Sequence, residues 1–350
     1  MKRTLIFGLL LALLLTGCAE TTRTDSRADS RADSQWTWHR AGQGDIFARS
    51  DTGYYFFVNG YLHYMDEKTM TPVVVCGKPN CMHMQETDRE KQRECHAYFT
   101  LWSGWGPTVY WQNGTVYVLS RGNVEGERAV LWQLSEDAST RTRLLTVPGA
   151  FDTQASGDSA ALHRGCFYIA MTQFDEKGNA FHEIRRYDLS HPEAEPELLY
   201  ESADQSINSL SDVRIRDNCL IFREDRTEGE RALLQLRLDG DGVVQPYDAK
   251  LPEPLAELGG LAEDGRYYYR LASASSDESG KSLYVYGADG TELLETPLAE
   301  AAPGVRGLYV SPGKHVFLYG FGADGGQVRF YIWYFEKDGI ETGKLTLTCL

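Results

Sequence analysis

A short peptide that recurs at a fixed distance constrains the fold of this chain more than any other feature. Residues Glu125-Gly126-Glu127-Arg128-Ala129-Val130-Leu131 reappear as Glu228-Gly229-Glu230-Arg231-Ala232-Leu233-Leu234, 103 residues later. This distance is two periods of about 51 residues, and periods of that length are typical of solenoids and β-propellers. From about Asp45 onward, short runs of Tyr, Val, Phe and Leu alternate with Asn-Gly, Asp-Gly and other glycine turns. That pattern predicts strands throughout and no long helix.

The period divides the chain into six units that share one internal order. Each unit is predicted to open with a strand and a tight turn, followed by an aromatic or β-branched second strand and by third and fourth strands. The predicted second strands are 54–58, 115–120, 166–171, 219–223, 266–271 and 315–319. The predicted third strands are 61–65, 129–134, 182–187, 232–238, 283–286 and 329–335. The predicted fourth strands include 72–75, 143–147, 197–200 and 344–350.

Four antiparallel strands per unit predict an all-β chain that forms a β-propeller of six four-stranded blades. A seven-bladed ring is the alternative, but residues 76–106 are too short and irregular to hold another blade. A pair of β-sandwiches is the competing architecture, and it predicts no such period. Residues 36–39 are a candidate closing strand.

The start of the chain has the layout of a secretory signal. A basic head, Met1-Lys2-Arg3, precedes a run of apolar or small residues that ends in Leu15-Thr16-Gly17-Cys18. This segment resembles the lipobox of bacterial lipoproteins. The resemblance implies that residues 1–17 are removed and that Cys18 carries the acyl chains, palmitate among them, so the chain is held on the outward, extracytoplasmic side of the cell membrane. An ordinary signal peptide or a short membrane helix is the alternative, although the apolar run is far shorter than the roughly 20 residues that span a bilayer.

The remaining chain is strongly acidic. Without residues 1–17, which hold Lys2 and Arg3, its formal charge is about −17. Such a surface repels nucleic acid and anionic lipid headgroups, which excludes nucleic acid as a partner and leaves membrane attachment to the acyl chains. Residues 18–35 comprise the lipidated cysteine and a polar tether, in which Arg27-Ala28-Asp29-Ser30 is repeated at once. The propeller is expected over residues 36–350, with a Cys/His-rich insertion at 76–106.

One cluster of residues carries metal or disulfide chemistry. Cys76, Cys81 and His83 lie close together, and Cys95 follows after a charged stretch. Three thiolates and an imidazole form the ligand set of a closed structural zinc site, with His96 as a spare ligand. The same cysteines could pair as disulfides, which an oxidising compartment favours, or stay unpaired. The spacing excludes covalent haem attachment, and the expected role is to staple a loop.

A second resemblance rests on the same residues. The pattern Cys-x-Lys-Pro-x-Cys-x-His from Cys76 to His83, followed by Cys-x-Ala-Tyr from Cys95, is similar to a segment of uncharacterised propeller-type lipoproteins of Gram-positive gut bacteria. The resemblance is specific over residues 53–99. In that family the gap between the histidine and the last cysteine is shorter, whereas here it runs from Met84 to Glu94 and is mostly charged or polar. The resemblance implies no biochemical activity.

The other cysteines and the charged residues give no clear catalytic site. Cys166, Cys219 and Cys349 are predicted to be small strand residues, because equivalent strands in stacked sheets lie beyond disulfide reach. The chain has no phosphate-binding loop, helical zinc-protease motif or nucleophile elbow. Charged residues near the inner strands are the remaining candidates for a channel-mouth active site: His163, Arg164, Arg214, Arg216, Glu263 and Asp264.

These observations favour a non-catalytic binding or scaffolding propeller for an extracellular protein or glycan. Trp102, Trp105 and Trp111 could form a sugar-stacking platform, with core packing as the alternative. A hydrolase or lyase acting on an extracellular polysaccharide is the second hypothesis. A metal-sensing or redox-sensing surface protein that uses the Cys/His cluster is the third.

Overall fold

The computed structural model describes residues 46–99, 107–120, 128–147, 159–216, 218–240, 242–248, 251–256, 261–273, 280–311, 313–324 and 327–350. The signal segment, Cys18, the tether, residues 36–39, Trp102 and Trp105 lie outside these residues. In the described part, no helix is long and apolar enough to cross a membrane.

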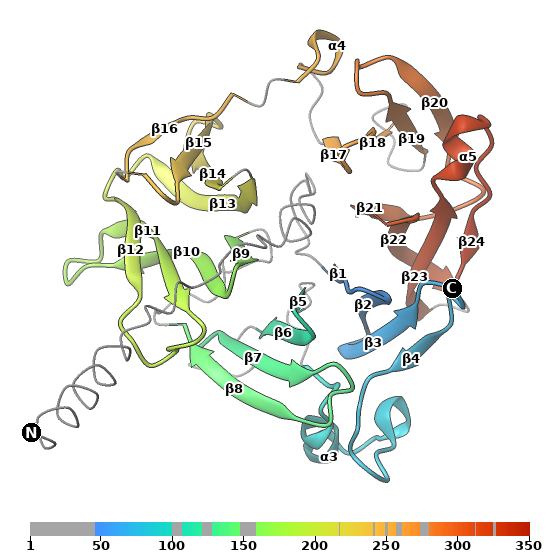
Figure 1. Ribbon diagram of the computed structural model, residues 1–350, viewed down its shortest axis with the longest axis horizontal. Helices are drawn as coiled ribbons and strands as arrows, with labels where there is room; N and C mark the ends of the chain where they lie inside the picture. The colour runs from blue at the N-terminus through green and yellow to red at the C-terminus, as the bar shows by residue number, and fades with distance from the viewer. Residues whose placement is uncertain are drawn as a thin grey trace, which may run out of the picture. The chain divides into compact units, whose positions relative to one another are not determined.

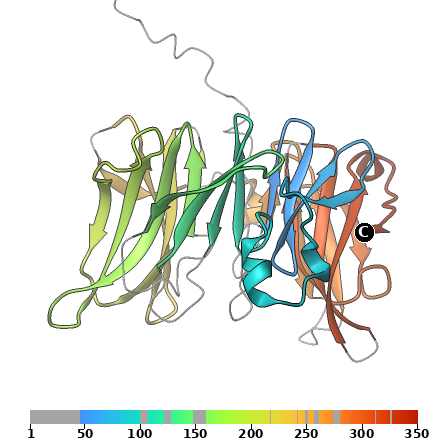
Figure 2. The ribbon, with the colours of Figure 1, turned by 90° about the horizontal axis from the view of Figure 1, so that it is seen from below.

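Six four-stranded antiparallel sheets surround a common axis, which confirms the predicted six-bladed β-propeller (Figure 1). Blade 1 contains β1 (Phe47–Arg49), β2 (Gly53–Val58), β3 (Tyr61–Asp66) and β4 (Pro72–Val74), and blade 2 contains β5 (Thr108–Gln112), β6 (Thr115–Ser120), β7 (Val130–Ser135) and β8 (Arg141–Thr146). Blade 3 contains β9 (Ala160–His163), β10 (Cys166–Phe174), β11 (Ala180–Asp188) and β12 (Glu197–Ser202), and blade 4 contains β13 (Ile207–Arg216), β14 (Cys219–Arg226), β15 (Arg231–Arg237) and β16 (Val244–Pro246). Blade 5 contains β17 (Leu261–Glu263), β18 (Tyr268–Ser273), β19 (Lys281–Tyr286) and β20 (Glu292–Pro297), and blade 6 contains β21 (Val305–Val310), β22 (His315–Asp324), β23 (Gln327–Glu336) and β24 (Thr348–Cys349). Seen from the side, the strands run roughly along the axis of the ring (Figure 2).

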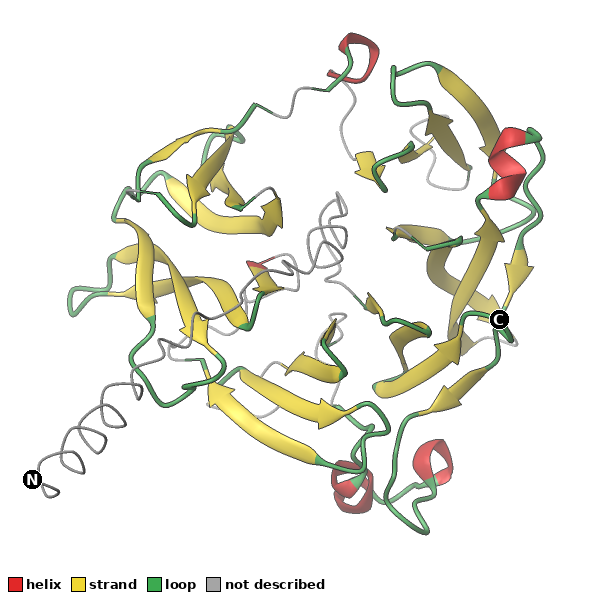
Figure 3. Ribbon diagram, viewed as in Figure 1, coloured by secondary structure: helices red, strands yellow, loops and turns green. Residues whose placement is uncertain are grey.

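Helical segments are short and lie between strands, in loops at the rim of the ring (Figure 3). They are η1 (His83–Gln85), α3 (Arg89–Glu94), α4 (Glu253–Ala256) and α5 (Asp338–Glu341). Both η1 and α3 belong to the connection between β4 and β5, the segment that carries the Cys/His cluster.

Local turn chemistry explains why the strands lie where the sequence places them. Asn59 and Gly60 both have positive φ (51° and 82°), as do Asn113 and Gly114 (50° and 76°), which is the geometry of a type I′ hairpin turn. By contrast, β18 begins two residues later than the predicted strand 266–271. The Oδ1 atom of Asp264 accepts hydrogen bonds from the next backbone amides, those of residues 266 and 267, at 2.9 and 2.8 Å, which holds them in a turn.

The core lies between neighbouring blades. Clusters of buried apolar residues join blades 1 and 2, 2 and 3, 3 and 4, 5 and 6, and 6 and 1. Because each blade is covered on both faces, a second strand such as β2 has five buried residues in a row instead of an alternating pattern. Among the described residues no such cluster joins blades 4 and 5, and an ion pair between Arg216 and Glu263 (3.3 Å) crosses that junction.

The ring closes without a strand shared between the two ends of the described chain. All strands of blade 1 come from residues 47–74 and all strands of blade 6 from residues 305–349. Blade 1 meets blade 6 through aromatic side chains. Phe47 on β1 stacks on Tyr309 of β21 and Phe317 of β22, with ring centroids 5.2 and 5.1 Å apart.

Candidate metal centre

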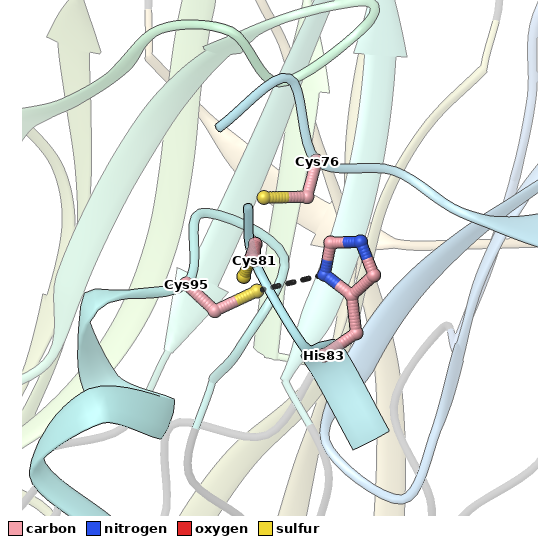
Figure 4. A group of neighbouring side chains, drawn as sticks. All are labelled: Cys76, Cys81, His83 and Cys95. Carbon is pink, nitrogen blue, oxygen red and sulfur yellow. Dashed lines mark hydrogen bonds between the residues drawn. The ribbon is translucent and has the colours of Figure 1, made fainter. Parts of the chain in front are cut away.

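Four side chains from the connection between β4 and β5 gather at one point. Cys76 lies just after β4, Cys81 lies in the turn that leads into η1, His83 is the first residue of η1, and Cys95 caps the end of α3. Their sulfur and imidazole nitrogen atoms all lie within 4.8 Å of one another (Figure 4). Cys95 is buried and the other three are partly buried. This Cys/His cluster could hold a metal ion, as its residue types predict.

The backbone turns Cys81 and His83 toward that point. Asn80 and His83 have φ values of 59° and 50°, in the left-handed region that is uncommon for residues other than glycine. The hydroxyl of Tyr61 donates a hydrogen bond to the carbonyl oxygen of His83 at 2.9 Å and holds this turn. A strained residue fixed by its surroundings in this way is typical of a preorganised site.

Gly77 is required for a reason other than turn formation. Its φ is not positive, but a Cβ atom built on it would lie 2.7 Å from the Cα atom of Ser139 in blade 2. The amide of Gly77 donates to the carbonyl oxygen of Ala138 at 3.4 Å. The loop that carries Cys76 therefore packs directly against the β7–β8 hairpin.

The distance between two of the donor atoms is compatible with tetrahedral zinc. The Sγ atom of Cys95 and the Nδ1 atom of His83 are 3.7 Å apart. Zinc–sulfur and zinc–nitrogen bonds of about 2.3 and 2.0 Å, at a tetrahedral angle, would place these atoms about 3.5 Å apart. Cys76, Cys81 and Cys95 are free thiols in the structure.

The surroundings of the thiols differ. Burial raises the pKa of the Cys95 thiol to about 12. Burial acts in the same direction on Cys76, but hydrogen bonds from the backbone amides of Lys78 and His96 outweigh it and lower the pKa of this thiol. The amide of Ala97 makes the equivalent bond to Cys95. The amide donors thus favour the thiolate form that a metal requires at Cys76, whereas at Cys95 burial outweighs the amide of Ala97.

Two further residues of the sequence prediction lie apart from the cluster. The Nδ1 atom of His96 is 2.8 Å from the carbonyl oxygen of Ala138, so this histidine contacts blade 2 and is not among the clustered donors. Trp111 is only 9% exposed, belongs to the core between blades 1 and 2, and donates from its indole nitrogen to Glu136 at 3.0 Å. Because Trp111 is buried in this cluster, the structure favours the core-packing alternative for this residue.

Four of the charged residues near the inner strands, Arg164, Arg216, Glu263 and Asp264, form contacts between blades. Arg164 donates to Asn218 at 3.5 Å across blades 3 and 4, and Lys337 of blade 6 lies 2.5 Å from Asp264 of blade 5. His163 is buried, and burial lowers the pKa of Arg214 to about 10. These contacts and the Arg216–Glu263 pair connect neighbouring sheets, a structural use of charge.

The other described cysteines stay apart from the cluster. Cys166 and Cys219 are partly buried free thiols, and Cys349 is an exposed free thiol.

The sequence reasoning did not single out Arg141, which the structure places beside the cluster. Its Nη1 atom donates to the carbonyl oxygens of Cys95 and Tyr98 at 3.1 and 2.8 Å. Its guanidinium lies over the rings of Phe99 and Trp132, with 4.0 and 4.2 Å to their centroids. Nothing in the sequence distinguishes this arginine from the others on outer strands.

No family model matches the sequence, and no curated protein matches it either. The fold is similar to solved propeller-containing enzymes. A prolyl endopeptidase matches with a TM-score of 0.53 and 13% identity over 91% of this chain and 51% of its own, so this chain spans about half the length of that protein. A puromycin-hydrolyzing peptidase from Mycobacterium tuberculosis (TM-score 0.41, 16% identity, 89% of this chain and 45% of its own) matches less well. An oligogalacturonate lyase from Vibrio parahaemolyticus gives a TM-score of 0.39 and 9% identity over 87% of this chain and 77% of its own. At these identities the likeness concerns the fold alone.

Proposed function

We propose that this chain is a zinc-stapled β-propeller that serves as a non-catalytic binding or scaffolding body, held outside the membrane by an acylated Cys18. The convergence of Cys76, Cys81, His83 and Cys95 carries the zinc part of the proposal. Four protein ligands fill a tetrahedral site, and a filled site is structural, since a catalytic zinc keeps one position open for water.

The non-catalytic binding role is supported by the ion pairs and hydrogen bonds that engage the charged residues near the inner strands. Propeller enzymes need carboxylates, imidazoles or guanidiniums that converge on a substrate. In the described part of this chain, Asp264 is engaged by Lys337 and Tyr269, and Glu263 by Arg216. The acidic surface and the lipobox resemblance favour an extracellular protein or glycan as partner.

Elemental analysis of the purified full-length protein tests the zinc site. We expect one zinc per chain, lost in Cys81→Ser and Cys95→Ser. Cys349→Ser is the matched control, because Cys349 is an exposed cysteine outside the cluster. Protein without zinc whose cluster cysteines resist alkylation until reduced would overturn the zinc site and establish disulfides instead.

Membrane attachment is tested separately. Wild-type protein should incorporate a palmitate analogue and fractionate with membranes, whereas Cys18→Ser should lose both properties. Unchanged labelling of Cys18→Ser would overturn the anchor.

A screen of the purified protein against glycans, cell-wall fragments and cross-linked surface proteins tests the binding role. Saturable binding without turnover supports the proposal. Depolymerisation of a polysaccharide by the protein would establish the hydrolase or lyase alternative.

A further inference from the structure

We propose that Arg141 of blade 2 is a positioning residue that balances the charge of the metal–thiolate centre, so that a metal held by the segment after blade 1 locks blade 2 in place. This inference rests on the zinc site proposed above. It concerns a residue from a different blade, which provides no ligand itself.

The first step is the setting of the guanidinium. Arg141 sits on β8 with its charged group between the rings of Phe99 and Trp132. The described residues provide no carboxylate in an ion pair with it, and its Nε atom has no hydrogen-bond partner. With the described residues, its hydrogen bonds go to the carbonyl oxygens of Cys95 and Tyr98. A cation in such a place is costly unless an anionic group lies nearby.

The second step is a count of charge at the cluster. Zn²⁺ with three thiolates and a neutral imidazole has a net charge of −1. That charge and the single positive charge of Arg141 cancel. A disulfide between two of the cysteines, with the third as a thiol, is neutral and leaves the cation uncompensated. Arg141 therefore favours the metal state of the cluster over the disulfide state.

The third step is the contact between the two charges. Arg141 donates to the carbonyl oxygen of Cys95, whose sulfur is one of the clustered donors, so its positive charge lies beside the proposed metal–thiolate centre. Hydrogen bonds of this kind orient metal ligands from outside the coordination sphere, and their loss typically weakens metal binding by 10- to 100-fold.

The fourth step connects the centre to the blade interface. The amide of Gly77 and the ring of His96, each one residue from a ligand, both contact the carbonyl oxygen of Ala138 on the β7–β8 hairpin. Arg141 is the first residue of β8, the second strand of this hairpin. The ligands and the charge that balances them thus come from opposite sides of the junction between blades 1 and 2.

The test compares zinc affinity of the full-length protein and its variants by competition with a chromophoric chelator. Arg141→Met removes the charge and keeps a long apolar side chain; we expect zinc affinity to fall by about 10- to 100-fold. Arg141→Lys keeps the charge and should recover part of this loss. Arg143→Met is the matched control, because Arg143 is exposed and lies farther from the Trp132 ring (5.7 Å), and it should change affinity less than about twofold.

A second readout separates this role from simple packing. Zinc should raise the Tm of wild-type protein by more than it raises that of Arg141→Met, whereas a packing residue would lower the Tm of the zinc-bound and zinc-free forms equally. Equal zinc affinity of Arg141→Met and wild type would overturn the role of Arg141 and leave the zinc site standing. Failure of the wild type to bind zinc would overturn both proposals.

Discussion

The Nδ1 atom of His83 lies 3.7 Å from the Sγ atom of Cys95, although the two residues are 12 positions apart in the chain. The intervening residues fold into η1 and α3, which bring the chain back to its starting point. The side chain of Asp88 caps α3 by accepting a hydrogen bond from the amide of Glu90 at 2.9 Å. The long gap therefore leaves the fourth ligand in position.

The hydroxyl of Tyr61 should contribute to metal affinity. Tyr61→Phe removes the hydrogen bond to the carbonyl oxygen of His83 and relaxes the left-handed turn. One hydrogen bond of about 1 kcal/mol corresponds to a loss of roughly fivefold in zinc affinity. Competition with a chromophoric chelator measures this loss of zinc affinity. Tyr64→Phe, which loses an exposed hydrogen bond to Thr52, is the control and should bind zinc as the wild type does.

The close approach of Gly77 to blade 2 should make this position intolerant of any side chain. We expect Gly77→Ala to lower the free energy of unfolding by about 1–3 kcal/mol, because the new Cβ atom would overlap Ser139. Denaturant unfolding of the zinc-loaded protein measures the change. Gly280→Ala is matched to it, since nothing lies within 4 Å of its Cβ position. Equal stability of the two variants would contradict the packing described for Gly77.

The aromatic contact that closes the ring should dominate its stability. Phe47→Ala removes a fully buried ring that stacks on Tyr309 and Phe317, and we expect a loss of about 3–5 kcal/mol in the free energy of unfolding. Phe174→Ala, at a side chain 49% exposed on β10, should cost clearly less than Phe47→Ala. Thermal and denaturant unfolding measure both variants.

The same junction should weaken in acid. Burial opposes ionisation of Glu67, but hydrogen bonds from the Tyr54 hydroxyl and the Lys314 amide, together with Arg49, outweigh it and hold the pKa of this carboxyl below its usual value. Because the folded-state pKa is the lower one, the stabilisation is complete above the ordinary carboxyl pKa of about 4.5 and is lost as the pH falls through the folded-state value.

Unfolding measured between pH 3 and 7 tests this assignment. Glu67→Gln should be less stable than the wild type at neutral pH, and the difference should shrink as the pH falls. Glu292→Gln, at an exposed glutamate on β20, is the control. A difference that stays constant with pH would show that Glu67 acts through packing.

The junction between blades 4 and 5 should be the point at which the ring opens first. Among the described residues, the Arg216–Glu263 pair crosses this junction, whereas each of the other junctions has a shared apolar cluster. Glu263→Gln should raise amide exchange in β13 and β17 and leave β1 and β21 unchanged. Glu341→Gln, which breaks an exposed pair with Arg266, should have no such effect. Uniform exchange changes around the ring would contradict a local opening.

The strands could be predicted because their signals are local. Asn-Gly turns fix the hairpins at residues 59–60 and 113–114, and buried β-branched and aromatic runs fix the strands between them. β18 begins two residues later than predicted, because Asp264 holds residues 266 and 267 in a turn although Tyr267 has a strand-forming side chain.

The candidate metal centre shows the same difference between residues with local sequence signals and residues without them. Cys76, Cys81 and His83 are close in sequence, so their convergence could be predicted, and the return of Cys95 through α3 agrees with that prediction. His96, Trp111 and Arg141 acquire their roles from contacts with another blade or from burial in the core. Contacts of this kind depend on the closed ring and leave no mark in the local sequence.

The stacking of Phe47 on Phe317 has a consequence for the order of folding. Each sheet is complete as soon as its own segment has been made, so the blades can form one after another. Phe47, however, meets its partner only when the last blade is present. While the chain is being made, one aromatic face of the first blade therefore stays exposed for almost the entire length of the chain, and this interval is the one in which it can aggregate.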